Sequence, residues 1–328
     1  MRTLITRRAL PALAASFVTA VTLTACGDNS STTEQSASAV TLTNCGRTVT
    51  LTEPASRAVT LNQGATETAL SLGAGPQMVG TAYLDDTIAP QWQQAYRQIP
   101  VLAEKFPSRE QVLEARPDLV LASYPSAFDD KAVGSQDSLA RLGIASYVDP
   151  FACADKSKRA PVAWDTIGAE IRDYGTMFGR TAEADSQVAQ LRTTLAGIES
   201  AKPADGRTIL WYDSNTDVPY VGGNAGGPQL IIDAVGGRNV FAGLDGAWAD
   251  GNWETVLEAD PDVIVLADAS WDTAEAKKQY LRGDPALRDL KAVRDGAFVV
   301  LPFSETTPGP RLIDGAASVA KQLGGLRG

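Results

Sequence analysis

The sequence reads Val112-Leu113-Glu114-Ala115-Arg116-Pro117-Asp118 at one point and, 144 positions later, Val256-Leu257-Glu258-Ala259-Asp260-Pro261-Asp262. Six of the seven residues are identical, and an apolar run follows each copy, at 119–122 and at 263–266. Proline cannot continue a helix, and such a run suits a strand that is covered on both faces. Each copy therefore predicts a helix end, a break and a buried strand. Two copies this similar predict two similar lobes, and a cleft between lobes is where small ligands bind.

The composition is that of an ordinary globular protein that is long enough for two lobes. The chain has 328 residues, of which 44% are hydrophobic and 21% are charged. Its formal net charge is −10. An acidic protein does not suit nucleic acid, whose phosphates require Lys and Arg, so we expect no nucleic-acid partner. Acidity of this kind mainly favours solubility.

The sequence contains no histidine, which removes several kinds of site. A Ser-His-Asp or Cys-His nucleophile and an imidazole zinc site are excluded, whereas carboxylate or tyrosine metal sites stay open. No phosphate-binding loop and no nucleophile elbow occurs, and the glycine-rich residues 222–227 lack the phosphate-loop spacing. The adjacent acid pairs Asp85-Asp86 and Asp129-Asp130 have no base or nucleophile beside them. We therefore expect no enzyme, with an exported two-lobed enzyme as the alternative.

The amino terminus has the pattern of an export signal. Arg2, Arg7 and Arg8 precede an apolar stretch at 9–25, which small residues close before Cys26. A transmembrane helix is the alternative, but the proline and the threonines in this stretch make it a poor span. Leu23-Thr24-Ala25-Cys26 resembles the bacterial lipobox, which implies that Cys26 carries the lipid.

We therefore predict a lipoprotein signal peptide at 1–26 and a disordered tether at 27–39, rich in Ser, Thr and Ala. Sec and twin-arginine export both stay open. Loss of the three arginines leaves 26 basic and 39 acidic residues, a charge of −13. Two other cysteines follow, Cys45 and Cys153, and an exported even pair usually forms a disulfide. Two buried free thiols are the alternative.

Alternating strand and helix patterns follow along the chain and predict an α/β fold with parallel sheets. The expected strands lie at 40–43, 48–52, 58–61, 78–82, 119–123, 145–148, 208–212, 263–267 and 298–301. The expected helices lie at 66–72, after an N-cap at Ser108, at 139–142, 164–178, 181–200, 229–235 and 312–323. We predict an N-terminal lobe at 40–178, a connecting helix at 179–202 and a C-terminal lobe at 203–328.

A series of short motifs from about Thr41 to the end resembles one protein class. The motifs are Arg57-Ala58-Val59-Thr60-Leu61-Asn62, Ala65-Thr66-Glu67, Leu72-Gly73, Val79-Gly80-Thr81-Ala82-Tyr83-Leu84-Asp85-Asp86, Pro117-Asp118-Leu119-Val120, Gly236-Gly237-Arg238-Asn239-Val240 and Pro308-Gly309-Pro310-Arg311. With two lobes and the lipobox, the chain resembles a bacterial substrate-binding lipoprotein of an ABC importer. This class binds iron–siderophore complexes, cobalamin or haem.

The resemblance implies a class III periplasmic binding protein fold, in which two Rossmann-like lobes with mainly parallel sheets are joined by a long helix and close little on binding. It also implies a monomer that is lipid-anchored at the extracytoplasmic face of the cell membrane. Its partners would be a membrane permease and a cytoplasmic ATPase. Relatives often dock with an acidic residue after the second Gly-Gly pair, where this chain has Arg238. Glu104, Glu110 and Glu254 are alternatives for docking.

Ligands of open parallel sheets bind beyond the carboxyl ends of the strands, so the residues that follow strands are the candidates. The predicted ligand-binding residues are Asn62, Gln63, Tyr83, Asp85, Tyr124, Ser126, Tyr212, Tyr220, Trp248, Trp271, Phe303, Glu305 and Arg311. Aromatic rings stack on flat ligands, and arginine pairs with carboxylate or catecholate oxygens. Structural roles stay open, because Tyr83 and Tyr124 end strands and Arg311 could instead cap Asp314.

These patterns predict a receptor that binds a ferric siderophore in the cleft and delivers it to an importer. Cobalamin and haem are the alternatives in the same class, and a zinc or manganese receptor is disfavoured because such sites rely on histidine. A siderophore already fills the coordination shell of its iron. We therefore expect neither a protein metal ligand nor a resident cofactor.

Overall fold

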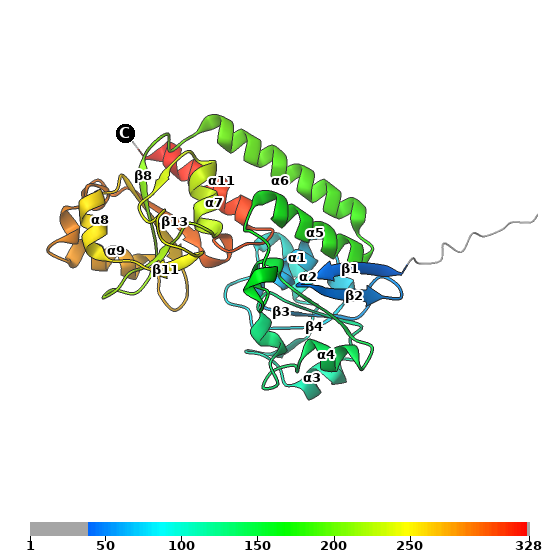
Figure 1. The fold of residues 1–328 in the computed structure, drawn as a ribbon. Helices are drawn as coiled ribbons and strands as arrows, with labels where there is room; N and C mark the ends of the chain where they lie inside the picture. Colours follow the sequence, from blue (N-terminus) through cyan, green and yellow to red (C-terminus); the bar gives the residue numbers. More distant parts are fainter. Residues whose placement is uncertain (1–38, 327–328) are drawn as a thin grey trace, which may run out of the picture. The chain divides into compact units, whose positions relative to one another are not determined.

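The computed structural model describes residues 39–326, which form an α/β fold with two mainly parallel sheets (Figure 1). The predicted signal peptide, the lipidated Cys26 and nearly all of the tether lie outside the described residues. Among the helices of residues 39–326, none is both long and apolar enough to span a membrane.

The first sheet has five strands, and all of them are parallel. In spatial order they are β5 (Val101–Ala103), β4 (Met78–Ala82), β3 (Ala58–Leu61), β6 (Leu119–Ala122) and β7 (Ala145–Val148). The central strands β3 and β6 are buried at every residue, as their apolar sequences predict. From β3 the chain adds β4 and β5 on one side of the sheet, and then β6 and β7 on the other side. The strand order therefore reverses between β3 and β6, where open sheets bind ligands.

The second sheet is mixed, with a parallel centre and an antiparallel edge. In spatial order its strands are β11 (Trp248–Asp250), β9 (Tyr220–Gly222), β8 (Thr208–Ser214), β12 (Val263–Asp268) and β13 (Phe298–Pro302), while β10 (Arg238–Asn239) pairs with the start of β8. Tyr220 and Trp248 lie beside glycine-rich segments, which predict loops, but the structure places them in the antiparallel strands β9 and β11. Three-residue strands are too short to show an alternating pattern.

Helices cover both sheets, and a hairpin precedes the first strand of the first sheet. The hairpin consists of β1 (Val40–Asn44) and β2 (Arg47–Leu51). The α-helices are α1 (Gln63–Ser71), α2 (Gln93–Tyr96), α3 (Arg109–Glu114), α4 (Gln136–Ala140), α5 (Trp164–Phe178), α6 (Thr181–Ala201), α7 (Gly227–Ala234), α8 (Trp253–Ala259), α9 (Ala274–Gly283), α10 (Lys291–Arg294) and α11 (Leu312–Gly325). The 3-10 helices are η1 (Gly75–Gln77), η2 (Pro90–Trp92), η3 (Pro125–Phe128), η4 (Pro150–Ala152), η5 (Lys156–Lys158), η6 (Leu287–Asp289) and η7 (Phe303–Glu305).

Helix α6 lies in the chain between the two sheets and packs against both α5 and α11 (Figure 1). Its buried residues are Ala184, Val188, Leu191 and Ile198, which recur at helical spacing and form one stripe. The stripe belongs to a hydrophobic core that also includes residues of α1 and α7. The two lobes therefore share packing through this helix. The exact lobe boundaries stay a prediction.

The repeated segment has the same local structure in both lobes. Arg116 and Asp260, which precede the two prolines, have backbone φ angles of 48° and 36°, in the left-handed region. Each following aspartate then accepts hydrogen bonds from the start of the first strand of its own sheet. Asp118 Oδ2 accepts from the backbone N–H groups of Ser56 at 2.8 Å and of Arg57 at 3.0 Å. Asp262 Oδ2 accepts from the Thr208 N–H at 2.9 Å. The repeat thus fixes where β3 and β8 begin.

Lys277 on α9 is buried, although it belongs to a stretch rich in charged residues, which usually indicates a solvent-exposed face. Its residue exposure is only 2%. Its ammonium group donates to the carbonyl oxygens of Ala267 at 2.5 Å and of Asp272 at 2.8 Å. Burial lowers its pKa, while Asp272 opposes that change. The carbonyl groups replace the hydration that the cation loses.

We expect Asp118→Ala and Asp262→Ala each to lower the free energy of unfolding by about 1–2 kcal/mol, because backbone N–H groups lose a charged acceptor. Urea denaturation followed by tryptophan fluorescence measures the change. Asp118→Asn keeps an acceptor oxygen and should cost less than Asp118→Ala. Equal denaturation midpoints for Asp118→Ala and for Asp289→Ala, at an exposed position, would contradict this role.

Candidate ligand-binding site

The carboxyl ends of β3, β4, β6 and β7 bring polar residues to one edge of the first sheet. Asn62 follows β3 and has a φ of 74°, and Tyr83 follows β4 with a φ of 58°. Both are non-glycine residues in the left-handed region, a strain that clusters at binding sites. Ser123 follows β6, and its hydroxyl accepts from the Ala65 N–H at 2.9 Å. A Cβ on Gly64 would lie 2.9 Å from that hydroxyl, so the first turn of α1 needs glycine there.

Two adjoining cavities open at this edge. One has a volume of about 150 Å³ and takes its walls from both lobes, including Gln63, Tyr124 and Trp248. The other has about 190 Å³ and lies between Tyr83 and Trp271. Each alone is smaller than a usual ligand site of roughly 300–1,000 Å³. They share three lining residues, however, namely Asp85, Tyr124 and Phe303. Together they form one candidate site between the lobes.

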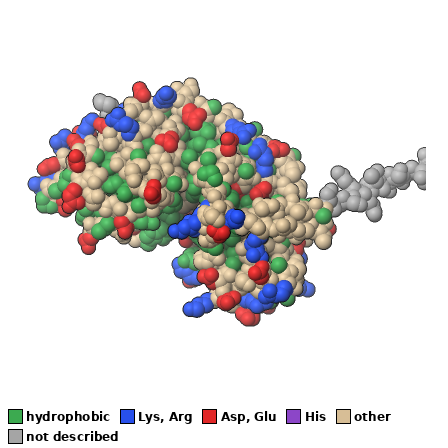
Figure 2. All heavy atoms as spheres, viewed as in Figure 1, with side chains coloured by type: hydrophobic (Ala, Val, Ile, Leu, Met, Phe, Trp, Pro, Cys, Tyr) green, Lys and Arg blue, Asp and Glu red, His purple; other side chains and the backbone are tan. Residues whose placement is uncertain are grey.

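Aromatic rings form the walls of this site. From the first lobe, Tyr83 packs edge-on against Phe106, with 4.6 Å between ring centroids. From the second lobe, Trp271 packs edge-on against Phe303 at 5.0 Å. Trp271 is 55% exposed, a large apolar surface that is free to contact a ligand. Figure 2 shows hydrophobic side chains gathered on the second lobe beside the hollow between the lobes.

The lining also includes buried polar atoms that lack partners among the described residues. Asn62 is 1% exposed, and its Oδ1 atom accepts no hydrogen bond. The indole N–H of Trp248 has no acceptor within hydrogen-bonding distance, but it lies near enough to Asp213 to lower the pKa of that carboxyl. Buried polar atoms in native proteins are usually paired, and exceptions often lie at functional sites. The unpaired Asn62 oxygen therefore supports a functional site at the end of β3.

Burial controls the charges of the lining. Asp149 follows β7 and is 8% exposed, and burial raises its pKa to about 7, although its carboxylate accepts from the Phe151 N–H at 2.9 Å. Burial also raises the pKa of Asp85, an effect that Lys105 opposes. The pKa of Tyr124 rises to about 12, mainly through burial and further through Asp85 and Asp149. The Tyr124 phenol therefore stays protonated at neutral pH.

Beside the cavities, an ion-pair network joins the lobes. Arg311, at the start of α11, contacts Glu305 through Nη2 at 2.9 Å and Glu67 of α1 through Nη1 at 3.5 Å. Its Nη1 also donates to the Ser304 hydroxyl at 2.5 Å, and that hydroxyl donates to Asp86 at 2.6 Å. Burial raises the pKa of Glu67 to about 7, which outweighs the attraction to Arg311. The network connects two segments that lie 244 positions apart in the chain.

The structure brings together most, but not all, of the predicted ligand-binding residues. Those that line the two cavities are Asn62, Gln63, Tyr83, Asp85, Tyr124, Ser126, Trp248, Trp271 and Phe303. The other four do not line them. Tyr212 is 1% exposed, and its hydroxyl donates to the Asn215 carbonyl at 2.5 Å. Tyr220 lies on β9, and Glu305 and Arg311 pair with each other in the network between the lobes.

Several lining residues escaped the sequence analysis: Gly64, Phe106, Ser123, Asp149, Phe151, Ala152, Val162, Ala247, Ser304, Thr307 and Pro308. Asp149 directly follows β7, so the rule of strand ends would have identified it. Ser123 was missed because the expected strand at 119–123 includes it, whereas β6 ends at Ala122. Phe106, Phe151 and Val162 belong to long connections, for which no local pattern predicts a position. The structure alone places these side chains.

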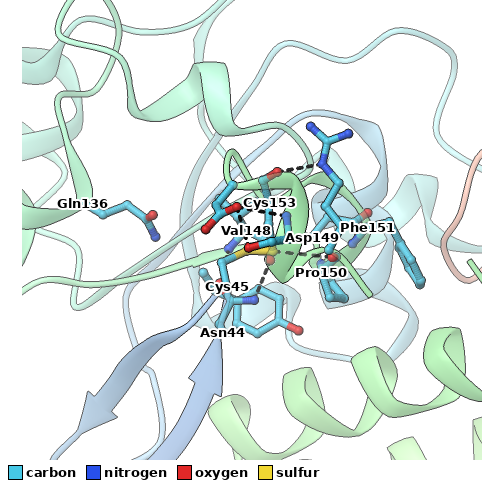
Figure 3. Close-up of a disulfide and its surroundings, with 12 residues drawn as sticks. Asn44, Cys45, Gln136, Val148, Asp149, Pro150, Phe151 and Cys153 are labelled. Carbon is cyan, nitrogen blue, oxygen red and sulfur yellow. Dashed lines mark hydrogen bonds between the residues drawn. A yellow bond between two sulfur atoms is a disulfide. The ribbon is translucent and has the colours of Figure 1, made fainter. Parts of the chain in front are cut away.

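A disulfide between Cys45 and Cys153 holds one wall of the site (Figure 3). The side chain of Asn44 in the hairpin donates to the Val148 carbonyl at 2.7 Å and accepts from the Val148 N–H at 2.9 Å. Phe151 and Ala152 precede the bridged Cys153 and line the cavity of about 150 Å³. The disulfide and these hydrogen bonds together tie the wall to the β1–β2 hairpin.

A larger cavity of about 600 Å³ lies elsewhere, between α6, η2 and the start of α11. It shares no lining residue with the two adjoining cavities. We place the candidate site at the smaller pair, because the strand ends, the strained residues, the exposed aromatic rings and the unpaired polar atoms all gather there.

An α/β body with two lobes and a lined site between them is the architecture of a solute-binding protein. Residues 59–305 match the model of the family described as periplasmic binding protein. The chain belongs to this family. No curated protein matches the chain.

Solved structures support the same assignment. The chain is 28% identical to a periplasmic binding protein from Veillonella parvula, over 88% of this chain and 99% of that one, with a TM-score of 0.76. It is also 28% identical to a protein described as the ABC-type Fe3+-hydroxamate transport system from Saccharomonospora viridis. That match covers 87% of this chain and 99% of the other, with a TM-score of 0.71. A periplasmic haem-binding protein from Roseiflexus shares the fold, with 21% identity over 83% of this chain and 99% of that one and a TM-score of 0.65.

We expect reduction of the disulfide to lower the free energy of unfolding by about 2–5 kcal/mol, because the bridge closes a long loop in the unfolded chain. The separation of 108 positions defines this loop. Denaturation with and without reductant measures the change in full-length protein in detergent. The double variant Cys45→Ala, Cys153→Ala is the control, and reductant should leave it unchanged. An unchanged wild-type midpoint in reductant would contradict the prediction.

Glu67 should make the protein less stable as the pH rises. Its ordinary pKa of 4.5 becomes about 7 in the folded protein, so the stabilising protonated form is lost between these values. That interval corresponds to about 3 kcal/mol. Between pH 4.5 and pH 8, we expect the free energy of unfolding of wild type to fall by about 2–3 kcal/mol more than that of Glu67→Gln. Denaturation at both pH values measures this. Asp149 and Glu170 titrate in the same direction in both proteins and cancel. The prediction would be contradicted if the difference in free energy of unfolding between the two proteins did not vary with pH.

Proposed function

We propose that this protein is an extracytoplasmic receptor that binds a ferric siderophore complex between its lobes and delivers it to an ABC importer. The observation that carries the proposal is the pair of aromatic walls, one from each lobe, at the strand ends. Tyr83 and Phe106 face the site from the first lobe, and Trp271 and Phe303 face it from the second. Such walls suit a bulky ligand that is partly apolar.

A ready-made chelate suits this site, because the chelator already fills the coordination shell of its iron and the protein needs no metal ligand of its own. The relative described as an Fe3+-hydroxamate transport system supports the same ligand class at 28% identity. The haem-binding structures share 21% identity or less with this chain and support the fold alone.

The remaining parts of the proposal concern delivery. The lipobox would attach the protein to the membrane through Cys26, and residues 27–39 would serve as the tether. Docking on a permease would use exposed acids, for which Glu104, Glu110 and Glu254 are the candidates, because Arg238 occupies the position where relatives often have an acid. We propose a monomer that holds its cargo without making or breaking a bond and that has no resident cofactor.

We expect ferrichrome, a ferric trihydroxamate, to bind with a Kd in the micromolar range or below. Trp271→Ala should weaken binding by about 10-fold to 100-fold, because an exposed ring loses its ligand contact. Equilibrium dialysis with radiolabelled iron in the chelate measures both values without relying on tryptophan emission.

Leu142→Ala is the matched control for this experiment. Leu142 is a large apolar residue that is 52% exposed and lines neither cavity, so its loss should leave the Kd unchanged. Haem and cobalamin are the ligand controls. Saturable binding of either one, with none of ferrichrome, would replace the siderophore proposal by the corresponding alternative.

A further inference from the structure

The lining of the candidate site has an unusual balance of charge. Among the described residues that line the two cavities there are two carboxylates, Asp85 and Asp149, and no lysine or arginine. The other polar lining groups are hydroxyl, amide and indole groups. Receptors for anionic ligands usually place Arg or Lys against the ligand oxygens. The interior of this site does not.

Arg311 is the cation that the sequence predicts for an anionic ligand, but its donors are directed to the protein. Nη2 contacts Glu305, while Nη1 contacts the Ser304 hydroxyl and approaches Glu67 and the Thr87 carbonyl. The side chain is only 8% exposed. Two carboxylates share this one guanidinium group, so the network has no positive charge in excess. A ligand could recruit Arg311 only by breaking the junction between the lobes.

Other basic side chains occur on the surface around the hollow (Figure 2), so their positions matter. Lys105 places its ammonium group 4.6 Å from the ring centroid of Tyr83. Lys158 lies against the hairpin turn at Gly46, and Arg159 donates through Nε to the Cys153 carbonyl at 2.7 Å. Lys156 is exposed on the same segment. None of these four lines either cavity. Of the four, Lys105 also acts on Asp85, where it opposes the rise in pKa, but it does not line a cavity.

We propose that this site selects ferric chelates by charge, binding neutral or cationic complexes and disfavouring anionic ones, and that Asp85 is the specificity-determining residue. This inference rests on the proposed function. Asp85 lines both cavities, so a chelate in either one lies close to its carboxylate. Inside a partly desolvated site, like charges repel and opposite charges attract far more strongly than in water. Ferric hydroxamates, whose iron centre is neutral, satisfy this requirement, whereas catecholate complexes and haem propionates carry negative charge.

A series of ligands with one iron-binding core tests the inference. Ferrioxamine B carries a free amine and a charge of +1, its N-acetyl form is neutral and its N-succinyl form has a charge of −1. We expect wild-type protein at pH 8 and low ionic strength to bind the cation about tenfold or more tightly than the anion. Equilibrium dialysis of full-length protein in detergent measures the three Kd values. Added salt should bring the three Kd values closer together, because it screens the charges.

Asp85→Asn removes the charge and keeps the shape of the side chain. It should therefore reduce the ratio between the Kd values of the anionic and the cationic complex by several-fold. Asp289→Asn, at an exposed position outside the site, is the matched control and should leave the ratio unchanged. If Asp85→Asn folds poorly, the wild-type series and Asp149→Asn still test the sign of the effect. An anion that binds wild type as tightly as the cation would overturn the charge selection but leave the proposed function intact. A failure of all three complexes to bind wild type or any variant would overturn both.

Discussion

The buried guanidinium group of Arg311 is the interaction on which the candidate site depends. It lies between Glu305 of its own lobe and Glu67 of the other, and its Ser304 contact continues to Asp86. Removing one partner from such a network leaves a buried charge without compensation, which is strongly unfavourable. The lobes therefore resist separation along this contact. Phe303 and Ser304 next to it, and Asp85 next to Asp86, form walls of the cavities. The geometry of the site follows from the junction.

The same network also shapes the chemistry of the site. Because Arg311 is paired with protein carboxylates, the lining presents aromatic rings and the carboxylates of Asp85 and Asp149 to a ligand. Burial then keeps the Tyr124 phenol protonated and brings the pKa of Asp149 to about 7. A lining of aromatic rings, neutral polar groups and two carboxylates, with no lysine or arginine among the described residues that line the cavities, suits the proposed cargo, whose metal is already coordinated. This is consistent with the family to which the chain belongs.

The sequence predicted most strands of the first sheet well. The expected strands at 58–61, 78–82 and 145–148 agree with β3, β4 and β7, and the capping pair Ser108 and Gln111 begins α3. These elements carry strong local signals. The short antiparallel strands β9 and β11 were not predicted, because three residues cannot show a period. Lys277 escaped because the carbonyl groups that hold it are brought to it by the fold rather than by a local pattern.

The sequence by itself determined the α/β class, the two lobes and the edge of each sheet where a ligand would bind, because hydrophobic periodicity and the Pro-Asp breaks are local properties of the chain. Only the tertiary structure decided which polar side chains are free to meet that ligand. Arg311 and Glu67 lie 244 positions apart, and Tyr212 becomes core while Asp149 becomes lining. The charge state and availability of a side chain depend on its burial and its partners, and both are set by contacts between distant segments.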